Sequence, residues 1–131
     1  RMEEDVLERR RRLLGEDHPD TLSAVSNLAS TLGRLGNNEQ AHQMRQDALE
    51  RLRRMFGEDH PETLAAAVNL ALSLMALNQR MRARQMAEQG FQGLRAALGN
   101  EHDLTRWARD HLGQIAASMG GIRRRRTGRR R

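Results

Sequence analysis

The sequence contains no cysteine, no lysine and no tyrosine, and its only aromatic residues are Phe56, Phe91 and Trp107. The absence of cysteine excludes disulfides and thiolate zinc sites. With so few aromatic side chains the core must be built from Leu, Ala, Val and Met, which favours close helix packing over a β-sandwich. No apolar run approaches the roughly 20 residues that cross a bilayer, so we expect no membrane span and no signal peptide.

Basic charge is concentrated at one end of the chain. All 23 basic residues are arginine, and the formal net charge is +6. Without the arginines of the last nine residues, the rest of the chain carries about −1. Such an end is interpreted as a solvated tail, as a segment that binds nucleic acid or another acidic surface, or as a segment bound by an acidic surface of its own or a neighbouring chain. The arginines are Arg123, Arg124, Arg125, Arg126, Arg129, Arg130 and Arg131.

An eight-residue motif recurs with a period of 42 residues. GEDHPDTL begins at Gly15, GEDHPETL begins at Gly57, and a divergent copy, GNEHDLTR, begins at Gly99. Around the first two copies, 13 of 23 aligned positions (13–35 and 55–77) are identical without a gap. A fixed period of this size indicates a repeat array.

The motif has the residues of a corner between two helices. Gly15 suits the left-handed conformation that ends a helix. His18 precedes a proline and is therefore disfavoured in the α region, while Pro19 fits the first position of the next helix. Asp17 or His18 is the expected N-cap. The second copy repeats these roles, whereas the third has Asp103 in place of proline.

Apolar residues at spacings of three and four predict six helices. The stripe of the second helix is Leu22, Val25, Leu28, Ala29, Leu32 and Leu35. Small residues are expected to allow close helix approach: Ala29, Ala41 and Ala48, and their counterparts Ala71, Ala83 and Gly90. The pair Gly120-Gly121 is expected to end the sixth helix. The predicted helices cover residues 2–14, 19–35, 39–55, 61–77, 81–98 and 103–119.

Long helices joined by short turns form antiparallel hairpins, and each hairpin must stack on its neighbours to bury its apolar faces. We therefore predict an all-α, right-handed superhelical stack of helix hairpins. The expected domain is 1–119, followed by an Arg-rich tail at 120–131. Its units are a half-repeat (1–14), two repeats (15–56 and 57–98) and a half-repeat (99–119). Because the sequence opens within the pattern, we expect it to be a piece of a longer protein.

The sequence has small residues at fixed places in each hairpin, the triplets Asn27-Leu28-Ala29 and Asn69-Leu70-Ala71, and the Gly-x-x-His-Pro-x-Thr-Leu corner. In these features it resembles tetratricopeptide repeats (TPRs) of the 42-residue kinesin-light-chain type. The resemblance implies protein–protein interaction: the first helices of the repeats line a concave face that binds an extended peptide. It also implies the sensor or docking part of a larger cytoplasmic signalling protein. The third repeat departs from the pattern, which suits a terminal, solvent-facing unit.

The resemblance implies a lining that can be carried over by aligned position. Asn27 and Asn69 could each bind a peptide backbone, or only bond neighbouring helices. Arg34 could pair with a ligand carboxylate. Trp107 could anchor a ligand or pack over the open end of the array. The lining is Ser23, Ser26, Asn27, Ser30 and Arg34, then Ala65, Val68, Asn69, Leu72 and Ala76, then Trp107, Asp110, His111, Gln114 and Ser118.

The sequence offers no credible catalytic set, so we expect neither an enzyme nor a cofactor. The acidic and histidine residues of the corners resemble metal ligands, but copies one repeat apart would lie on the order of 10 Å from each other, too far to share an ion. Capping explains them more simply. The alternative function is association with nucleic acid or an acidic surface through the arginine tail. We also expect self-association through the open face of the first helix.

Overall fold

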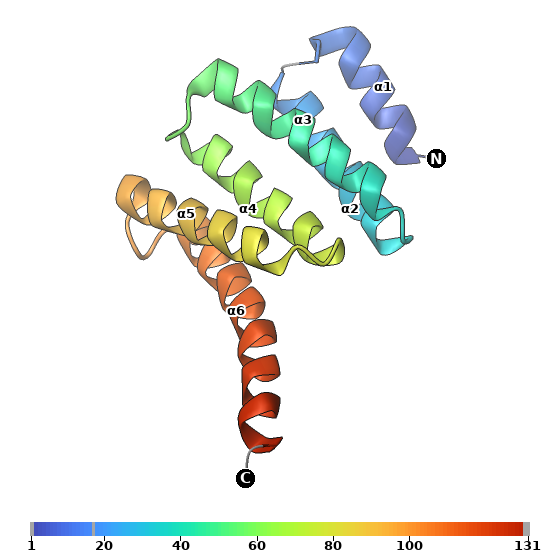
Figure 1. Cartoon of the computed structure of the whole chain (residues 1–131). Coiled ribbons are helices and arrows are strands. Elements are labelled where there is room, and N and C mark those ends of the chain that lie inside the picture. The colour runs from blue at the N-terminus through green and yellow to red at the C-terminus, as the bar shows by residue number, and fades with distance from the viewer. Residues whose placement is uncertain (1, 17, 130–131) are drawn as a thin grey trace.

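The computed structural model of the chain is all-α (Figure 1). It describes residues 2–16 and 18–129, with side chains over the same residues except Pro19 and 119–129. No helix in this described part is both long and apolar enough to cross a membrane. The described residues form six helices and no strand: α1 (Met2–Leu14), α2 (Pro19–Arg34), α3 (Asn38–Phe56), α4 (Pro61–Ala76), α5 (Arg80–Leu98) and α6 (Asp103–Arg129).

The first five helices agree with the predicted ranges to within one residue at each end, but α6 does not. It continues through Gly120-Gly121 to Arg129, so the prediction that these glycines end it is wrong. Glycine lowers helix propensity by about 1 kcal/mol, but no proline follows to stop the helix, and arginine is a good helix former. Within the predicted tail, the structure does not describe the side chains of Arg123 to Arg126 and Arg129. It describes no part of Arg130 and Arg131.

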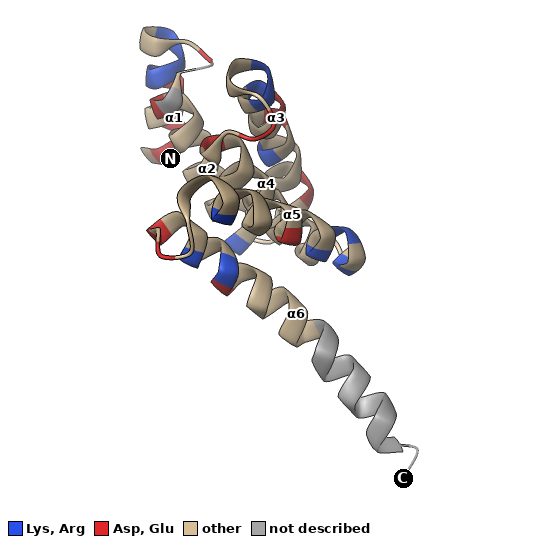
Figure 2. Cartoon of the chain, turned by 90° about the vertical axis from the view of Figure 1, so that its left-hand side faces the viewer, with Lys and Arg blue, Asp and Glu red and all other residues tan. Residues whose placement is uncertain are grey.

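Each helix packs against the next one along the chain, and α4 also contacts α6. Figure 1 shows the helices stacked as successive hairpins from α1 to α6. This arrangement confirms the predicted all-α stack. Figure 2 shows the positions of the charged residues on the helices. Helix α1 is acidic near its start and basic near its end. That polarity complements the helix dipole.

The corner residues adopt the predicted backbone conformations. Gly15, Gly57 and Gly99 have φ values of 90°, 87° and 88°, in the left-handed region that favours glycine. His18 is extended, with φ −68° and ψ 139°, and His60 has nearly the same values. His18 caps α2 through its side chain, whereas Asp17, the other candidate cap, lies outside the described residues.

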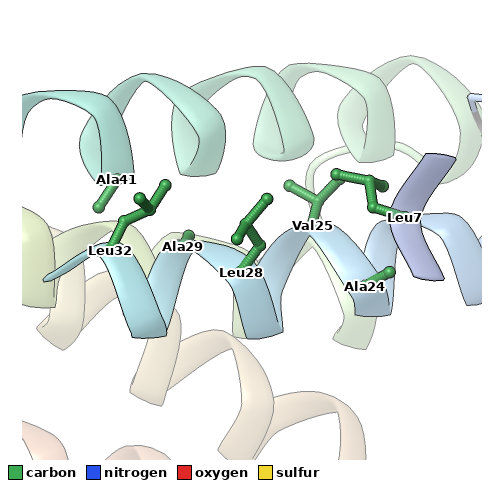
Figure 3. Close-up of a cluster of buried hydrophobic side chains, with 7 residues drawn as sticks. All are labelled: Leu7, Ala24, Val25, Leu28, Ala29, Leu32 and Ala41. Atoms are coloured by element: carbon green, nitrogen blue, oxygen red, sulfur yellow. The ribbon is translucent and has the colours of Figure 1, made fainter. Parts of the chain in front are cut away.

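The core is built from Leu, Ala and Val. Leu7 of α1, five residues of α2 and Ala41 of α3 form one buried cluster. Figure 3 shows Leu7 beside Val25 at one end of this cluster and Ala41 beside Leu32 at the other. Ala29 and Ala41 are almost wholly buried, in agreement with their predicted role at close helix contacts. Leu35 was expected on the same stripe but is 53% exposed. It is the C-cap of α2, so it lies beyond the last helical turn that the core covers.

Candidate functional site

A cavity of about 310 Å³ lies between α2 and α4, and residues of α3 also line it. Most of its lining side chains are small or apolar, and the two charged ones are Arg45 and Glu62. A concave, mostly apolar space with a few polar groups is the usual form of a ligand site. The lining residues are Leu22, Ser23, Val25, Ser26, Arg45, Ala48, Leu52, Phe56, Glu62, Ala65, Ala66 and Asn69. We refer to this space as the α2–α4 groove.

One face of α3 runs along the α2–α4 groove. Arg45, Ala48, Leu52 and Phe56 follow one another at spacings of three and four, so they lie on the same side of the helix. At 1.5 Å per residue, Arg45 and Phe56 are about 16 Å apart along the axis. The groove is therefore cationic at one end and aromatic at the other.

Glu62 belongs to the aromatic end. It lies in the first turn of α4, which His60 caps. The imidazole of His60 stacks on the Phe56 ring, with centroids 4.4 Å apart. The carboxylate of Glu62 and the guanidinium of Arg45 therefore mark opposite ends of the groove, and a ligand that spans both meets opposite charges.

Arg45 bridges the two walls of the groove. Its Nη1 donates to the Ser73 hydroxyl of α4 at 2.7 Å, and its Nη2 donates to the Ser30 hydroxyl of α2 at 3.2 Å. Its Nε atom is buried and makes no hydrogen bond. Among the described residues no carboxylate forms an ion pair with Arg45.

The half-buried position of Arg45 has an electrostatic cost. Burial lowers the pKa of its guanidinium, because the charged form loses hydration and gains no carboxylate. An arginine nevertheless remains cationic in a protein. Serine hydroxyls satisfy two of its N–H groups but leave its charge uncompensated. An anionic group that entered the groove would compensate it.

Four residues of the predicted lining do border the α2–α4 groove: Ser23 and Ser26 of α2, and Ala65 and Asn69 of α4. Ser30 takes part through its bond to Arg45. The structure thus brings these residues together in one place. Their contact with a ligand stays a prediction.

Val68 does not belong to this surface. It is wholly buried in a cluster with Leu94 and Ala108, so it packs against the neighbouring helices and does not line a ligand face. The reason is the close approach of α5, where Gly90 leaves room for the Val68 side chain. Leu72, one turn further along α4, is half-buried and lies outside the groove lining.

Two other predicted residues of α2 also lie outside the groove lining. Arg34 is exposed, and its Nη2 donates to the Thr31 hydroxyl at 3.2 Å. The Thr31 hydroxyl in turn donates to a Glu3 carboxylate oxygen of α1 at 2.6 Å, which ties α1 to α2. Asn27 is exposed and does not border the cavity.

The predicted residues of the third repeat lie on α6, away from the groove lining. Trp107 is half-buried against the cluster that contains Leu104 and Phe91, an arrangement that matches the packing alternative. His111 contacts the Trp107 ring at a centroid distance of 4.8 Å, and its Nδ1 lies 2.8 Å from the Trp107 carbonyl. Gln114 is exposed.

A glutamate at each of the first two corners forms an ion pair with an arginine of a neighbouring helix. Glu16 lies 2.9 Å from Arg11 and 3.8 Å from Arg51, and Glu58 lies 3.0 Å from Arg53. Within the part of the chain that the structure describes, no group of three or more His, Asp or Glu side chains is placed to hold a metal ion. These carboxylates therefore fasten the corners to neighbouring helices.

Sequence analysis missed Arg45, Phe56 and Glu62 as lining residues. A signal for Arg45 was present, because it stands on the inward stripe of its helix, between Ala41 and Ala48. Its counterpart 42 residues later is Ala87, which is wholly buried. An arginine where the other repeat has a buried alanine indicates a local difference in packing.

Comparison with known proteins extends these observations. The tetratricopeptide repeat family model matches three consecutive segments, residues 1–20, 21–62 and 63–103. No curated protein sequence matches the chain.

Solved structures share the fold at low sequence identity. Two crystal structures of the kinesin-light-chain-type, nearly identical TPR-like repeats of a Podosopora anserina protein superpose with a TM-score of 0.76, at 22% and 21% identity. Each covers 94% of this chain and 58% of its own chain. The crystal structure of BtubC (BKLC) from P. vanneervenii gives a TM-score of 0.69 at 22% identity, covering 90% of this chain and 47% of its own. The chain thus spans about half the length of these neighbours.

Proposed function

Because this chain belongs to the tetratricopeptide repeat family, we propose that it is a protein–protein interaction module whose α2–α4 groove binds an extended segment of a partner. The observation that carries this proposal is the cavity itself. It opens between the first helices of the two repeats, and it holds an arginine that no carboxylate neutralises among the described residues. The proposal gives the chain no catalytic role.

The dimensions of the groove limit the ligand. An extended peptide advances about 3.3 Å per residue, so the roughly 16 Å between Arg45 and Phe56 accommodates about five residues. Ala48, Ala65 and Ala66 leave room for modest apolar side chains in the middle. Asn69 offers an amide donor and acceptor to a peptide backbone.

Charge gives the ligand a direction. A carboxylate at the Arg45 end would compensate the buried guanidinium. A basic side chain at the other end would meet Glu62. The ligand that fits best is a segment of about five residues, acidic at one end, apolar in the middle and basic at the other end.

A displayed random heptapeptide library panned on the intact chain tests this proposal. We expect the recovered peptides to share an acidic residue separated by two or three positions from a basic one. Ala65→Trp, which fills the groove, should abolish their recovery. Ala96→Trp, the same change at an exposed position of α5, is the matched control and should not. Recovery of the same peptides by the Ala65 variant would refute the groove as the binding site.

We further propose that the chain acts as the sensor or docking part of a larger cytoplasmic signalling protein. The alternative function, association with nucleic acid or an acidic surface, rests on the seven arginines of the last nine residues. Deletion of residues 121–131 separates the two functions. It should abolish salt-sensitive retention on immobilised DNA and leave peptide recovery intact. Loss of both activities would count against the groove.

A further inference from the structure

The three corners share a histidine cap. His18, His60 and His102 each precede the first residue of a helix, and the Nδ1 atom of each accepts a hydrogen bond from the backbone N–H two residues later. The three N–H groups belong to Asp20, Glu62 and Leu104, and all three distances are 3.1 Å. The same contact thus recurs at every described corner where α2, α4 and α6 begin.

This contact requires a neutral imidazole. A neutral ring carries one proton, and here the proton must be on Nε2 so that Nδ1 can accept. Protonation places a hydrogen on both ring nitrogens and removes the acceptor. It also puts a positive charge at a helix N-terminus, where the helix dipole disfavours it.

We propose that His18, His60 and His102 form a proton-sensitive switch that loosens the starts of α2, α4 and α6, and with them the α2–α4 groove, as the pH falls from 7.5 to 5.5. Imidazole is the side chain that titrates in this range. Protonation removes a hydrogen bond that only the folded state makes, so we expect acidification to destabilise the folded chain.

The switch bears directly on the groove. The first two turns of α2 and α4 carry four of its lining residues: Leu22, Ser23, Glu62 and Ala65. In addition, the His60 ring stacks on Phe56, which closes one end of the groove. Release of the caps would therefore displace both walls. This consequence rests on the proposed function, whereas the loss of stability does not.

The charges around the rings do not replace the lost hydrogen bonds. Glu16, Glu58 and Glu101 are each paired with an arginine of a neighbouring segment. The hydrogen bond from Arg106 lowers the pKa of Glu101, which therefore stays ionised over this range.

The remaining charged groups at the corners have mixed effects. Asp59 and the first-turn carboxylates of Asp20, Glu62 and Asp103 attract a cationic ring, but a carboxylate cannot restore an acceptor at Nδ1. Arg10 and Arg109 donate to the carbonyls of Asp20 and Asn100, and their charge opposes protonation.

The test uses thermal unfolding of the full chain, followed by circular dichroism at pH 7.5 and 5.5. Loss of three caps should lower the melting temperature by about 10 °C. The triple variant His18→Asn, His60→Asn, His102→Asn keeps a capping acceptor that does not titrate. At pH 7.5 its melting temperature should match that of the native chain. Between pH 7.5 and 5.5 its melting temperature should fall by less than about a third of the native decrease.

The other two histidines provide the control. The double variant His42→Asn, His111→Asn should keep the full native pH response. If the triple variant does not fold, the ring tautomers of the native chain decide instead: nitrogen NMR at pH 7.5 should show the proton on Nε2 at all three caps. A native chain that melts at the same temperature at both pH values overturns the proposal, as does a triple variant with the native response or an Nδ1-protonated tautomer. None of these measurements uses a peptide, so the proposed groove function stands or falls separately.

Discussion

Val68 of α4 and Gly90 of α5 lie so close together that a Cβ on Gly90 would stand 2.6 Å from the Val68 Cγ2 atom. It would also stand 3.1 Å from the Leu64 carbonyl oxygen. Real Cβ atoms are essentially never found at the shorter distance, so the Val68 side chain or one of the two helices would have to shift. Ala48, the counterpart of Gly90, faces the groove instead.

We therefore expect Gly90→Ala to reduce the free energy of unfolding. Overpacking costs about 1–3 kcal/mol, and the gain in helix propensity returns up to about 1 kcal/mol, which leaves a net loss of about 1–2 kcal/mol. Gly113→Ala is the matched control, because nothing lies within 4 Å of its added Cβ. It should stabilise the chain by about 0.5–1 kcal/mol. Urea unfolding of both variants checks the prediction, and a stabilised Gly90 variant would contradict it.

Buried threonines differ in their hydrogen bonding from one corner to the next. The Thr63 hydroxyl donates to the Leu52 carbonyl at 3.3 Å, and Thr105 donates to the Leu94 carbonyl at the same distance. Each bond ties the start of a helix to the end of the preceding one. Thr21 occupies the same repeat position, but its hydroxyl is buried without a partner.

Threonine-to-valine substitutions should therefore have opposite effects at the two corners. Thr63→Val removes a buried hydrogen bond and should cost about 1 kcal/mol. Thr21→Val removes an unsatisfied hydroxyl and should be neutral or stabilising by up to about 1 kcal/mol. Chemical denaturation of the two variants makes the comparison. Equal losses at both sites would show that Thr21 has a partner in solution.

The corners and helices could be predicted from sequence because their causes are local. Gly57, His60 and Pro61 fix the end of one helix and the start of the next through their own backbone preferences. The apolar spacing then identifies the buried faces. The resemblance to tetratricopeptide repeats is confirmed by the family match, and the kinesin-light-chain-type structures share the fold.

The groove could not be predicted in the same way, because it depends on how closely non-adjacent helices approach. Ser26 and Val68 occupy the same repeat position, yet Ser26 borders the cavity and Val68 is wholly buried. In the second repeat, the small residues Ala87 and Gly90 let α4 and α6 come together. In the first repeat, Arg45 stands where Ala87 does and holds the walls apart. Carrying the lining over from repeat to repeat assumes equal spacing, and that assumption fails here.

The outer face of α1 predicts self-association of this chain. Met2 is 81% exposed and Leu13 is 75% exposed, on the same helix as the half-exposed Val6. The acidic first turn and basic last turn of α1 would complement each other if two copies paired antiparallel. Sedimentation velocity should therefore show a coefficient that rises with concentration.

Charge on this face should prevent that pairing. The double variant Val6→Glu, Leu13→Glu should remain monomeric at concentrations where the native chain associates. Leu35→Glu, the same change at the exposed C-cap of α2, should associate as the native chain does. A native chain that sediments as a monomer at high concentration would contradict the prediction.

Arg45 should determine the acidic preference of the groove. Arg45→Leu removes the cation, and because the two serine bonds are lost while an uncompensated charge disappears, we expect the free energy of unfolding to change by less than about 1 kcal/mol. Affinity for an acidic peptide recovered on the native chain should fall roughly 10- to 100-fold, as for loss of a desolvated charge pair. Fluorescence anisotropy with the labelled peptide measures this change.

A double-mutant cycle then assigns the contact. Replacing the acidic residue of the peptide by its amide should weaken binding to the native chain by a similar factor, but it should have little further effect on the Arg45 variant. Arg34→Leu is the control, because Arg34 is exposed and lies outside the groove lining. It should leave affinity unchanged. Additive losses in the cycle would mean that the peptide carboxylate does not bind at Arg45. Weaker binding to the Arg34 variant would support Arg34 as the partner of the ligand carboxylate, as sequence alone suggested.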